Sequence, residues 1–558
     1  MRRRAGSANA SPGCESHKAL AGGIPVDVGS VCNHILITGA VGLSCQDGPL
    51  ADEHMSFLDK TVDAAEPERA TMADEHPAVE RPRPDRRRIA ANFVTLAATN
   101  VLGLVVTILV SIYVRRALGP AAIGQVSWAL AALSYLSILV NPGLTTVGQR
   151  ELAKSPQRAQ ELLALILTLQ TVLALAVYGL VVAIAALDLR GPVVSLLLLI
   201  QGVGVYLTAL NTGWLLQANE RMVLPSLATL AFNALQLPVL LLFIHRPEDV
   251  LLYAVLGLPF TVMGIAFNLW YAAHHRLVKL LRLRPTLAGA GALLRESWPL
   301  ALSQGAILIY FNSGTLILGF TDGDEAVGQY ATAYRLMMVA TVVTAALWNA
   351  YFPVLARSHN SSVEATALSR EYLGLLAWMG LPIAALGWAE GRHVVELMYG
   401  AEFAASGPYF EWLCLNIALV FVNYGVSAIL VPWGHGKLQL KITATCAAVN
   451  LALNAIAIPL YGPWGAVATT LVAESLMLVL GLAARRRGGI FWHPVLPIVA
   501  PPLVCSAAVA LGLAVLPASL DRYWWLQLIA GAAVLGGCLL ISERGVILGM
   551  IRRKAPAR

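Results

Sequence analysis

Charged residues are scarce in this sequence. Only 13% of the 558 residues are Asp, Glu, Lys or Arg, whereas 57% are hydrophobic. A soluble domain has about 25% charged residues, and apolar runs of membrane-spanning length recur along this chain. The composition therefore excludes a soluble enzyme and predicts an all-α protein that crosses a membrane many times.

Motifs for metals, disulfides and nucleotides are also missing. The seven cysteines form no CxxC pair and no Cys/His spacing that would bind a metal. No GxxxxGK[ST] loop is present to hold the phosphates of ATP. We therefore expect no cofactor, no metal site and no binding to nucleic acid.

Groups for catalysis are not gathered in any loop either. A membrane polymerase, ligase or glycosyltransferase needs positioned carboxylates, or a nucleophile beside its base. The loop VRRALGPAAIG contains no acid, and no other loop clusters such residues. We expect that the protein is not an enzyme, and keep this kind of enzyme as an alternative.

The first 88 residues differ in composition from the rest. They are rich in Ala, Gly, Pro and charge, and their longest apolar piece, HILITGAVGLSC (34–45), is too short to cross a bilayer. We predict a disordered cytoplasmic tail. Alternatively, translation starts at Met72, which opens the short basic lead-in MADEHPAVERPRPDRRR. N-terminal sequencing that finds residues before Met72 would exclude the second interpretation.

From residue 90 onward, fourteen apolar segments are long enough to cross a bilayer as helices. Short loops separate them, and none of the loops is long enough to form an exported domain. The expected spans are 91–113, 122–145, 161–186, 192–216, 223–244, 250–273, 297–319, 327–356, 368–388, 408–432, 438–459, 463–484, 494–517 and 523–543.

Lys and Arg are distributed unequally between the two sets of loops. The set on the side of the N terminus holds most of them, among them Arg150, Arg276 and Arg485. Positively charged loops stay in the cytoplasm, so we expect both termini to be cytoplasmic and the basic loops to meet anionic lipids. The opposite set of loops is expected to contain only Arg115, Arg116, Arg190, Arg246, Arg392 and Arg522.

A short motif occurs twice. AIGQ (122–125) recurs as AVGQ (326–329), and each copy opens the second span of its half. Six spans followed by six in the same order indicate a parallel repeat whose halves meet around an axis along the membrane normal. The expected organisation is a tail at 1–88, an N-lobe of six helices at 89–275, a basic cytoplasmic linker at 276–296, a C-lobe of six helices at 297–486, a helix pair at 487–545 and a basic tail at 546–558.

Polar residues interrupt several of the apolar spans. Asn100 lies in the first span, Gln304 and Asn312 in the seventh, and Arg335 and Asn349 in the eighth. Such side chains avoid lipid. They either form ordinary hydrogen bonds between helices or line a substrate site between the two lobes. Both interpretations remain open for the amides, and these five residues are our candidates for substrate binding.

An arginine within the hydrocarbon layer needs compensation. Three arrangements would compensate Arg335: snorkelling of its side chain to the membrane surface, pairing with a buried acid, and binding of an anion in a water-filled cavity. Glu474, in the twelfth span, is the best candidate for the acid. We favour the anion, because a guanidinium donates two parallel hydrogen bonds to a phosphate and keeps its charge.

Two segments carry a resemblance to a known family. LGPAAIGQVSWALAALSYLSILVNPGLTTVGQRELAKSP (118–156) resembles the first loop and second helix of polysaccharide-exporting flippases, and GFTDGDEAVGQYATAYRL (319–336) resembles the matching part of their second half. These flippases form the O-antigen branch of the multidrug/oligosaccharidyl-lipid/polysaccharide (MOP) superfamily. The resemblance covers residues 90 to about 545. It implies a fold of fourteen helices in two lobes, and alternating access that moves undecaprenyl-pyrophosphate-linked oligosaccharides across the inner membrane.

The related lipid II flippases differ in their first helix. Asn100 and Val106 stand where those proteins have arginines, which argues against lipid II as the substrate. Their arginine in helix 8 matches Arg335 in the sequence AYRL.

The resemblance also concerns ion coupling. It places the cation ligands of helices 11 and 12 on Asn450, Asn454 and Thr470, but the acid that completes this site in helix 7 is missing here. The resemblance therefore argues against a sodium site. Glu474 remains as the candidate for coupling transport to an ion.

Together these features predict a flippase in the bacterial inner membrane. Its expected partners are a lipid-linked oligosaccharide, membrane lipids, a polysaccharide polymerase and glycosyltransferases. A drug or cation exporter of the same superfamily is the main alternative, and it would carry an acid between its lobes in place of Arg335. A scaffold without transport activity would not need Arg335 at all.

Overall fold

The computed structural model describes residues 86–279, 282–358, 362–487 and 494–542, and every regular element in these ranges is a helix. The predicted disordered tail (1–88) lies outside the described residues except for its last three, which begin a helix. The predicted basic tail (546–558) lies outside them altogether.

Thirteen helices in the described part of the chain are long and apolar enough to cross a membrane. One of them, α3 (Arg86–Val140), is two helices joined at Gly119, where φ is 73°. Pro120 follows and cannot continue the hydrogen bonding of the first helix. With α3 counted as two spans, the predicted all-α architecture of fourteen spans is confirmed.

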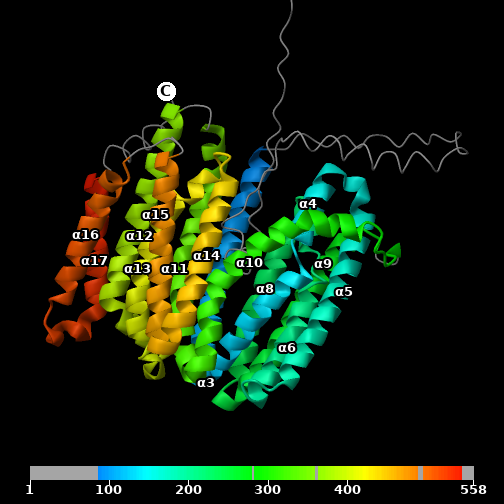
Figure 1. Ribbon diagram of the computed structural model, residues 1–558, viewed down its shortest axis with the longest axis horizontal. Helices are drawn as coiled ribbons and strands as arrows, with labels where there is room; N and C mark the ends of the chain where they lie inside the picture. The colour runs from blue at the N-terminus through cyan, green and yellow to red at the C-terminus, as the bar shows by residue number, and fades with distance from the viewer. Residues whose placement is uncertain (1–85, 280–281, 359–361, 488–493, 543–558) are drawn as a thin grey trace, which may run out of the picture.

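Most helices of the first half lie on the right in Figure 1 and most helices of the second half on the left, with α3 and α10 between the two groups. We call the two halves the N-lobe and the C-lobe. The N-lobe contains α3, α4 (Leu144–Lys154), α5 (Ala159–Ala186), α6 (Pro192–Thr208), α7 (Gly213–Ala218), α8 (Val223–Phe243) and α9 (Val250–His274). The C-lobe contains α10 (Ala290–Thr321), α11 (Gly323–Arg357), α12 (Ser362–Tyr399), α13 (Ser406–Val426), α14 (Gly436–Tyr461) and α15 (Pro463–Arg487). The final pair, α16 (Leu496–Ala514) and α17 (Trp524–Ser542), packs against α12.

The boundaries differ from expectation at the start of the C-lobe and after α3. Helix α10 begins at Ala290, inside the segment expected to be a linker. The loop expected after residue 145 contains α4, an amphipathic helix with Leu144, Val147 and Leu152 buried. Its charged residues masked this buried stripe in the hydropathy pattern.

The centre of the C-lobe is α13. This helix packs against α11, α12 and α15, and 72% of its most apolar stretch is buried. By contrast, the outward faces of peripheral helices expose large apolar side chains such as Leu242 in α8 and Ile541 in α17. Exposed apolar surface of this kind suits contact with lipid, since a soluble protein would not present so much of it to water.

The two lobes meet most closely where α3 crosses α11, near the bottom of Figure 1. We call this the kink end, because it contains Gly119. A Cβ atom on Gly124 would lie 1.8 Å from the carbonyl oxygen of Asp324, and one on Gly328 would lie 1.8 Å from that of Pro120. Each glycine thus touches the residue four positions before the other. The repeated AIGQ and AVGQ motifs supply this reciprocal contact.

Polar contacts reinforce the crossing at the kink end. The carboxylate of Asp324 accepts a hydrogen bond from Gln125 Nε2 at 2.8 Å and forms an ion pair with Arg190. The guanidinium of Arg190 also stacks over the ring of Trp128, 4.9 Å from its centre. Asp324 belongs to the C-lobe and its three neighbours to the N-lobe, so this cluster holds the lobes together.

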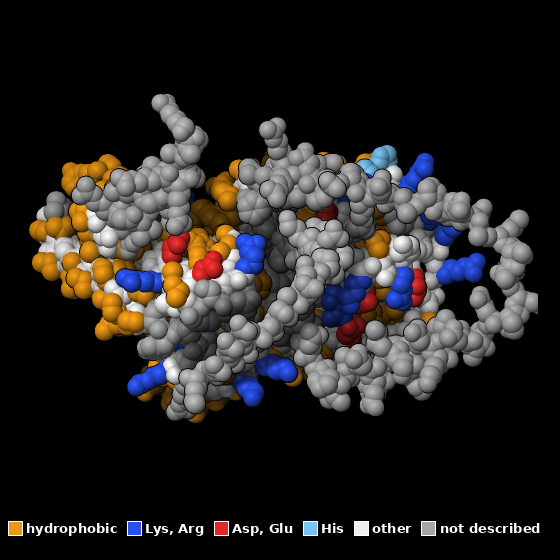
Figure 2. All heavy atoms as spheres, turned by 90° about the horizontal axis from the view of Figure 1, so that it is seen from above, with side chains coloured by type: hydrophobic (Ala, Val, Ile, Leu, Met, Phe, Trp, Pro, Cys, Tyr) orange, Lys and Arg blue, Asp and Glu red, His pale blue; other side chains and the backbone are white. Residues whose placement is uncertain are grey.

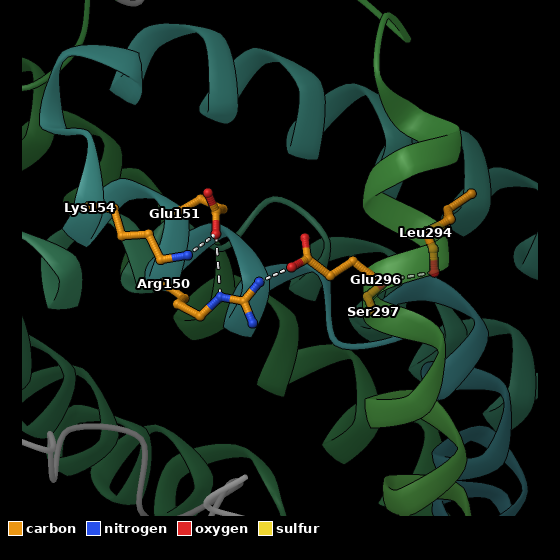
Figure 3. Close-up of polar contacts among 6 residues, drawn as sticks. All are labelled: Arg150, Glu151, Lys154, Leu294, Glu296 and Ser297. Atoms are coloured by element: carbon orange, nitrogen blue, oxygen red, sulfur yellow. Dashed lines mark hydrogen bonds and ion pairs between the residues drawn. The ribbon is translucent and has the colours of Figure 1, made fainter. Parts of the chain in front are cut away.

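At the opposite end, which we call the basic end, the lobes are joined by a different pair of helices. Figure 3 shows Arg150 of α4 in an ion pair with Glu296 of α10. Gly143, just before α4, lies against Leu300 of α10. The face seen from above in Figure 2 carries Lys and Arg side chains over both lobes.

The glycine crossing generates a first prediction. Gly328→Ala places a methyl group where the carbonyl of Pro120 lies, so α3 and α11 must separate. Overpacking of this kind costs about 1–3 kcal/mol, and we expect a lower unfolding temperature for the purified protein in detergent. Gly264→Ala in α9 is the matched control, because nothing lies within 4 Å of its Cβ position. Equal unfolding temperatures for the two variants would contradict a tight crossing.

Candidate functional site

Arg335 lies within electrostatic range of two residues of the N-lobe. It lies in α11, roughly 18 Å along the axis from the start of the helix at 1.5 Å per residue. Its half-buried side chain interacts electrostatically with Arg115 of α3 and Tyr253 of α9. Because both neighbours belong to the N-lobe, the guanidinium faces the space between the lobes and not the surrounding lipid.

Arg115 does not lie in a loop, which corrects the expectation from the sequence. It is part of α3, one turn before the kink. Its guanidinium donates hydrogen bonds to Ser111 Oγ in the same helix at 2.5 Å and to Thr332 Oγ1 in α11 at 3.1 Å. The guanidinium carbon lies 5.4 Å from the centre of the Tyr399 ring in α12. Arg115 therefore bridges the lobes.

Arg115 and Arg335 are thus two like charges within electrostatic range of each other, and neither has a carboxylate partner among the described residues. The titratable groups that act on Arg115 are Tyr399, Arg335 and Tyr253, with no carboxylate among them. Among the described residues, no acid lies within 4.0 Å of either arginine. Pairing of Arg335 with Glu474, one of the arrangements considered from the sequence, is not observed.

The amides predicted to bind substrate fall into two groups. Gln304 and Asn349 are half-buried and have no hydrogen-bond partner among the described residues. Asn312 donates from Nδ2 to the carbonyl of Leu308 in its own helix at 3.2 Å. Asn100 is half-buried in the first part of α3. Gln304 and Asn349 are therefore the amides most available to a ligand.

The candidate cation ligands form a closed hydrogen-bonded cluster. Asn454 Nδ2 donates to Ser313 Oγ and to Asn450 Oδ1, each at 2.9 Å. Asn450 Nδ2 donates to the carbonyl of Thr469 at 3.3 Å, and the hydroxyl of Thr469 donates to Asn454 Oδ1. Thr470 donates to the carbonyl of Ala466 at 2.8 Å and also hydrogen-bonds Tyr330 of α11. The amide oxygens are already used as acceptors, so the cluster ties α10, α14 and α15 together.

Glu474 is buried beside this cluster and belongs to a separate network. Its Oε1 accepts a hydrogen bond from Tyr310 Oη in α10, and its Oε2 accepts one from Asn423 Nδ2 in α13, both at 2.7 Å. Only 6% of Glu474 is exposed. Both carboxylate oxygens thus have neutral donors, an arrangement in which a carboxyl group can hold or release a proton without breaking an ion pair.

Other arginines expected in loops also lie in helices: Arg116 in α3, Arg392 in α12 and Arg485 in α15. Arg485 lies within α15 and is completely buried. It donates from Nη2 to Ser369 Oγ at 3.3 Å and lies 5.9 Å from the Trp433 ring centre. Arg485 is therefore part of the packing of the C-lobe and not of the charged surface.

Several of these residues were not found from the sequence. The span limit at 113 excluded Arg115, although the Gly119–Pro120 pair marks the true end of the helix. Tyr310 and Asn423 lie 164 and 51 residues from Glu474. No sequence period connects them, so only the packing of three helices reveals this network.

Comparison with known proteins finds similarity to a family and to a curated relative. Residues 89–359 match the polysaccharide biosynthesis protein family. A relative from Shigella dysenteriae, described as "Putative O-antigen transporter", is 26% identical over 387 residues, which cover 67% of this chain and 93% of the relative.

Solved structures share the fold at lower sequence identity. The lipid II flippase MurJ in an inward closed conformation is 14% identical with a TM-score of 0.67, and the match covers 82% of this chain and all of that one. An inward-facing multidrug resistance transporter of the MATE family, in the MOP superfamily, is 17% identical with a TM-score of 0.56, covering 72% and 98%. These two structures share with this chain the arrangement of its membrane-spanning helices.

Proposed function

We propose that this protein is a flippase that moves an undecaprenyl-pyrophosphate-linked oligosaccharide across the bacterial inner membrane by alternating access. The observation that carries the proposal concerns Arg335. This half-buried arginine lies within electrostatic range of the opposite lobe and has no carboxylate partner among the described residues. An unpaired guanidinium at this depth suits an anionic ligand. The relative described as an O-antigen transporter supports the same function.

The charge distribution orients the protein. Arg150, Lys154 and Arg276 belong to the basic end, and basic loops remain in the cytoplasm. We place this end, and both chain termini, on the cytoplasmic side. The kink end then faces outward, and its contacts between α3 and α11 close the protein on that side.

The substrate then has three parts with different surroundings. The pyrophosphate lies near Arg335, which donates bidentate hydrogen bonds to it. The sugars contact Gln304 and Asn349, whose amides lack partners among the described residues, with Asn100 and Asn312 as further contacts. The polyprenyl chain stays in the lipid, where it avoids exposure to water. A polysaccharide polymerase and glycosyltransferases are the proposed partners.

The alternatives fit the charges less well. A drug or cation exporter would need an acid facing its ligand, whereas Arg115 and Arg335 would repel a cation. Glu474 is buried, and both of its carboxylate oxygens already accept hydrogen bonds from Tyr310 and Asn423, so it does not face a ligand. A polymerase or glycosyltransferase would need a cluster of catalytic groups that the described residues do not contain around Arg335.

Arg335→Ala tests the proposed function. In cells where this variant replaces the native chain, we expect at least a tenfold loss of surface polysaccharide, because removing a charged hydrogen-bond donor costs about 1.5–3 kcal/mol. Arg357→Ala is the control, since Arg357 is exposed at the other end of the same helix. Membrane abundance of both variants is measured by immunoblot. Wild-type export by an equally abundant Arg335→Ala protein would refute the proposed site.

Glu474→Gln tests the proposal that Glu474 couples transport to an ion. Glutamine preserves the shape of the side chain and still bonds Tyr310 and Asn423, so we expect an unfolding temperature close to that of the wild type. It cannot titrate, so we expect export to fall at least severalfold. Glu474→Ala should lower the unfolding temperature as well, because it leaves two buried donors without an acceptor. Normal export by Glu474→Gln would limit Glu474 to a structural role.

A further inference from the structure

We infer that Arg115 is a second ligand for the charged group of the substrate, and that Arg115 and Arg335 together select a diphosphate over a monophosphate. This inference rests on the proposed function and adds to it a residue, Arg115, that the proposed function does not use. It starts from Arg115, which the hydropathy of the sequence had assigned to a loop but which lies between the lobes.

The first argument is the placement of the two arginines. Arg115 comes from α3 and Arg335 from α11, the helices that cross at the kink end. Thr332, which accepts a hydrogen bond from Arg115, lies one helical turn before Arg335. One turn corresponds to about 5.4 Å along the axis. Arg115 therefore contacts α11 within one turn of Arg335, and the two arginines lie at the same contact between the lobes.

The second argument is the balance of charge. The two arginines repel each other, and no acid among the described residues neutralises them. Nearby Arg190 shows the usual solution, because it pairs with Asp324. A ligand with charge on two adjacent phosphate groups compensates both arginines, whereas a monophosphate compensates them incompletely.

The third argument is that Arg115 and Arg335 have N–H donors that make no hydrogen bond to the described residues. Arg115 uses Nε for Thr332 and Nη1 for Ser111, and a guanidinium has five N–H donors. Its remaining donors and those of Arg335 are available to phosphate oxygens. The ring of Tyr399 holds the Arg115 guanidinium from one side and limits its movement.

A consequence follows for release of the substrate. The diphosphate site is divided between the lobes, with Arg115 in the N-lobe and Arg335 in the C-lobe. Opening of the kink end separates α3 from α11, and it therefore separates the two arginines as well. The affinity for a diphosphate is highest while the protein is closed at the kink end and falls when it opens.

Binding of short polyprenyl phosphates to the purified full-length protein tests this inference. The probes are farnesyl diphosphate, farnesyl monophosphate and inorganic pyrophosphate, measured by calorimetry in detergent. For the wild type, we expect farnesyl diphosphate to bind about tenfold more tightly than the monophosphate, as expected for one extra charged hydrogen-bonding partner. Inorganic pyrophosphate should compete with farnesyl diphosphate if the head group is the source of this preference.

Arg115→Gln should remove the preference. We expect its affinity for farnesyl diphosphate to fall about tenfold and its affinity for the monophosphate to change less than about twofold. Arg116→Gln is the matched control, since Arg116 is adjacent, exposed and bonded to the carbonyl of Met398 at 2.9 Å. Arg115→Lys keeps the charge but not the planar fork, and should show an intermediate affinity.

The outcomes separate the inference from the proposed function. An Arg115→Gln protein that folds and keeps the full preference would overturn the inference, and so would a failure of pyrophosphate to compete. If Arg115→Gln does not fold, the Arg115→Lys result decides in the same way. Loss of export in Arg335→Ala together with an unchanged preference in Arg115→Gln would refute the role of Arg115 alone. Full export by Arg335→Ala would refute the proposed function instead.

Discussion

The arrangement of the two lobes has to accommodate two arginines, Arg115 of α3 and Arg335 of α11, that lie within electrostatic range of each other. An arginine in the middle of a membrane helix costs about 2.5–3.5 kcal/mol on insertion scales, and a second one nearby adds repulsion. A carboxylate would relieve both effects, as Asp324 does for Arg190. Arg115 has instead hydroxyl and aromatic neighbours. Arg485 shows that packing within one lobe can enclose a single guanidinium among hydroxyl and aromatic groups. A binding site explains Arg115 and Arg335 better than packing, because here two like charges from different lobes are brought together.

The close approach of these charges depends on two glycines. Gly124 and Gly328 allow α3 and α11 to touch through their backbones, and Arg115 and Arg335 lie on these two helices within electrostatic range of each other. Larger side chains at the crossing would move the helices apart, and with them the arginines. The repeated motif therefore has two effects, since it closes the kink end and assembles the charged site. A movement that reverses the first effect also reverses the second.

The sequence revealed the features that depend on local composition. Fourteen spans could be predicted because each is predominantly apolar over a membrane-spanning length, and Arg335 was found because it is a charged residue within such a span. Arg115 was missed, since it lies at the end of a span, where hydropathy does not distinguish a helix from a loop. The partners of Glu474 were missed for a different reason: Tyr310 and Asn423 meet it only through the packing of α10, α13 and α15. Contacts between distant helices leave no period in the sequence.

Helix α10 takes part both in the polar network around Glu474 and in the ion pair between the lobes at the basic end. It carries Tyr310, which bonds the buried Glu474 within the C-lobe, and Glu296, which pairs with Arg150 of the N-lobe at the basic end. It also packs against α3, the helix of Arg115. A protonation change at Glu474 alters the acceptor available to Tyr310. It therefore changes the hydrogen bond that joins α10 to α15 within the C-lobe. Because α10 also contacts the N-lobe at two places, it is the element through which such a change would reach the contact between the lobes.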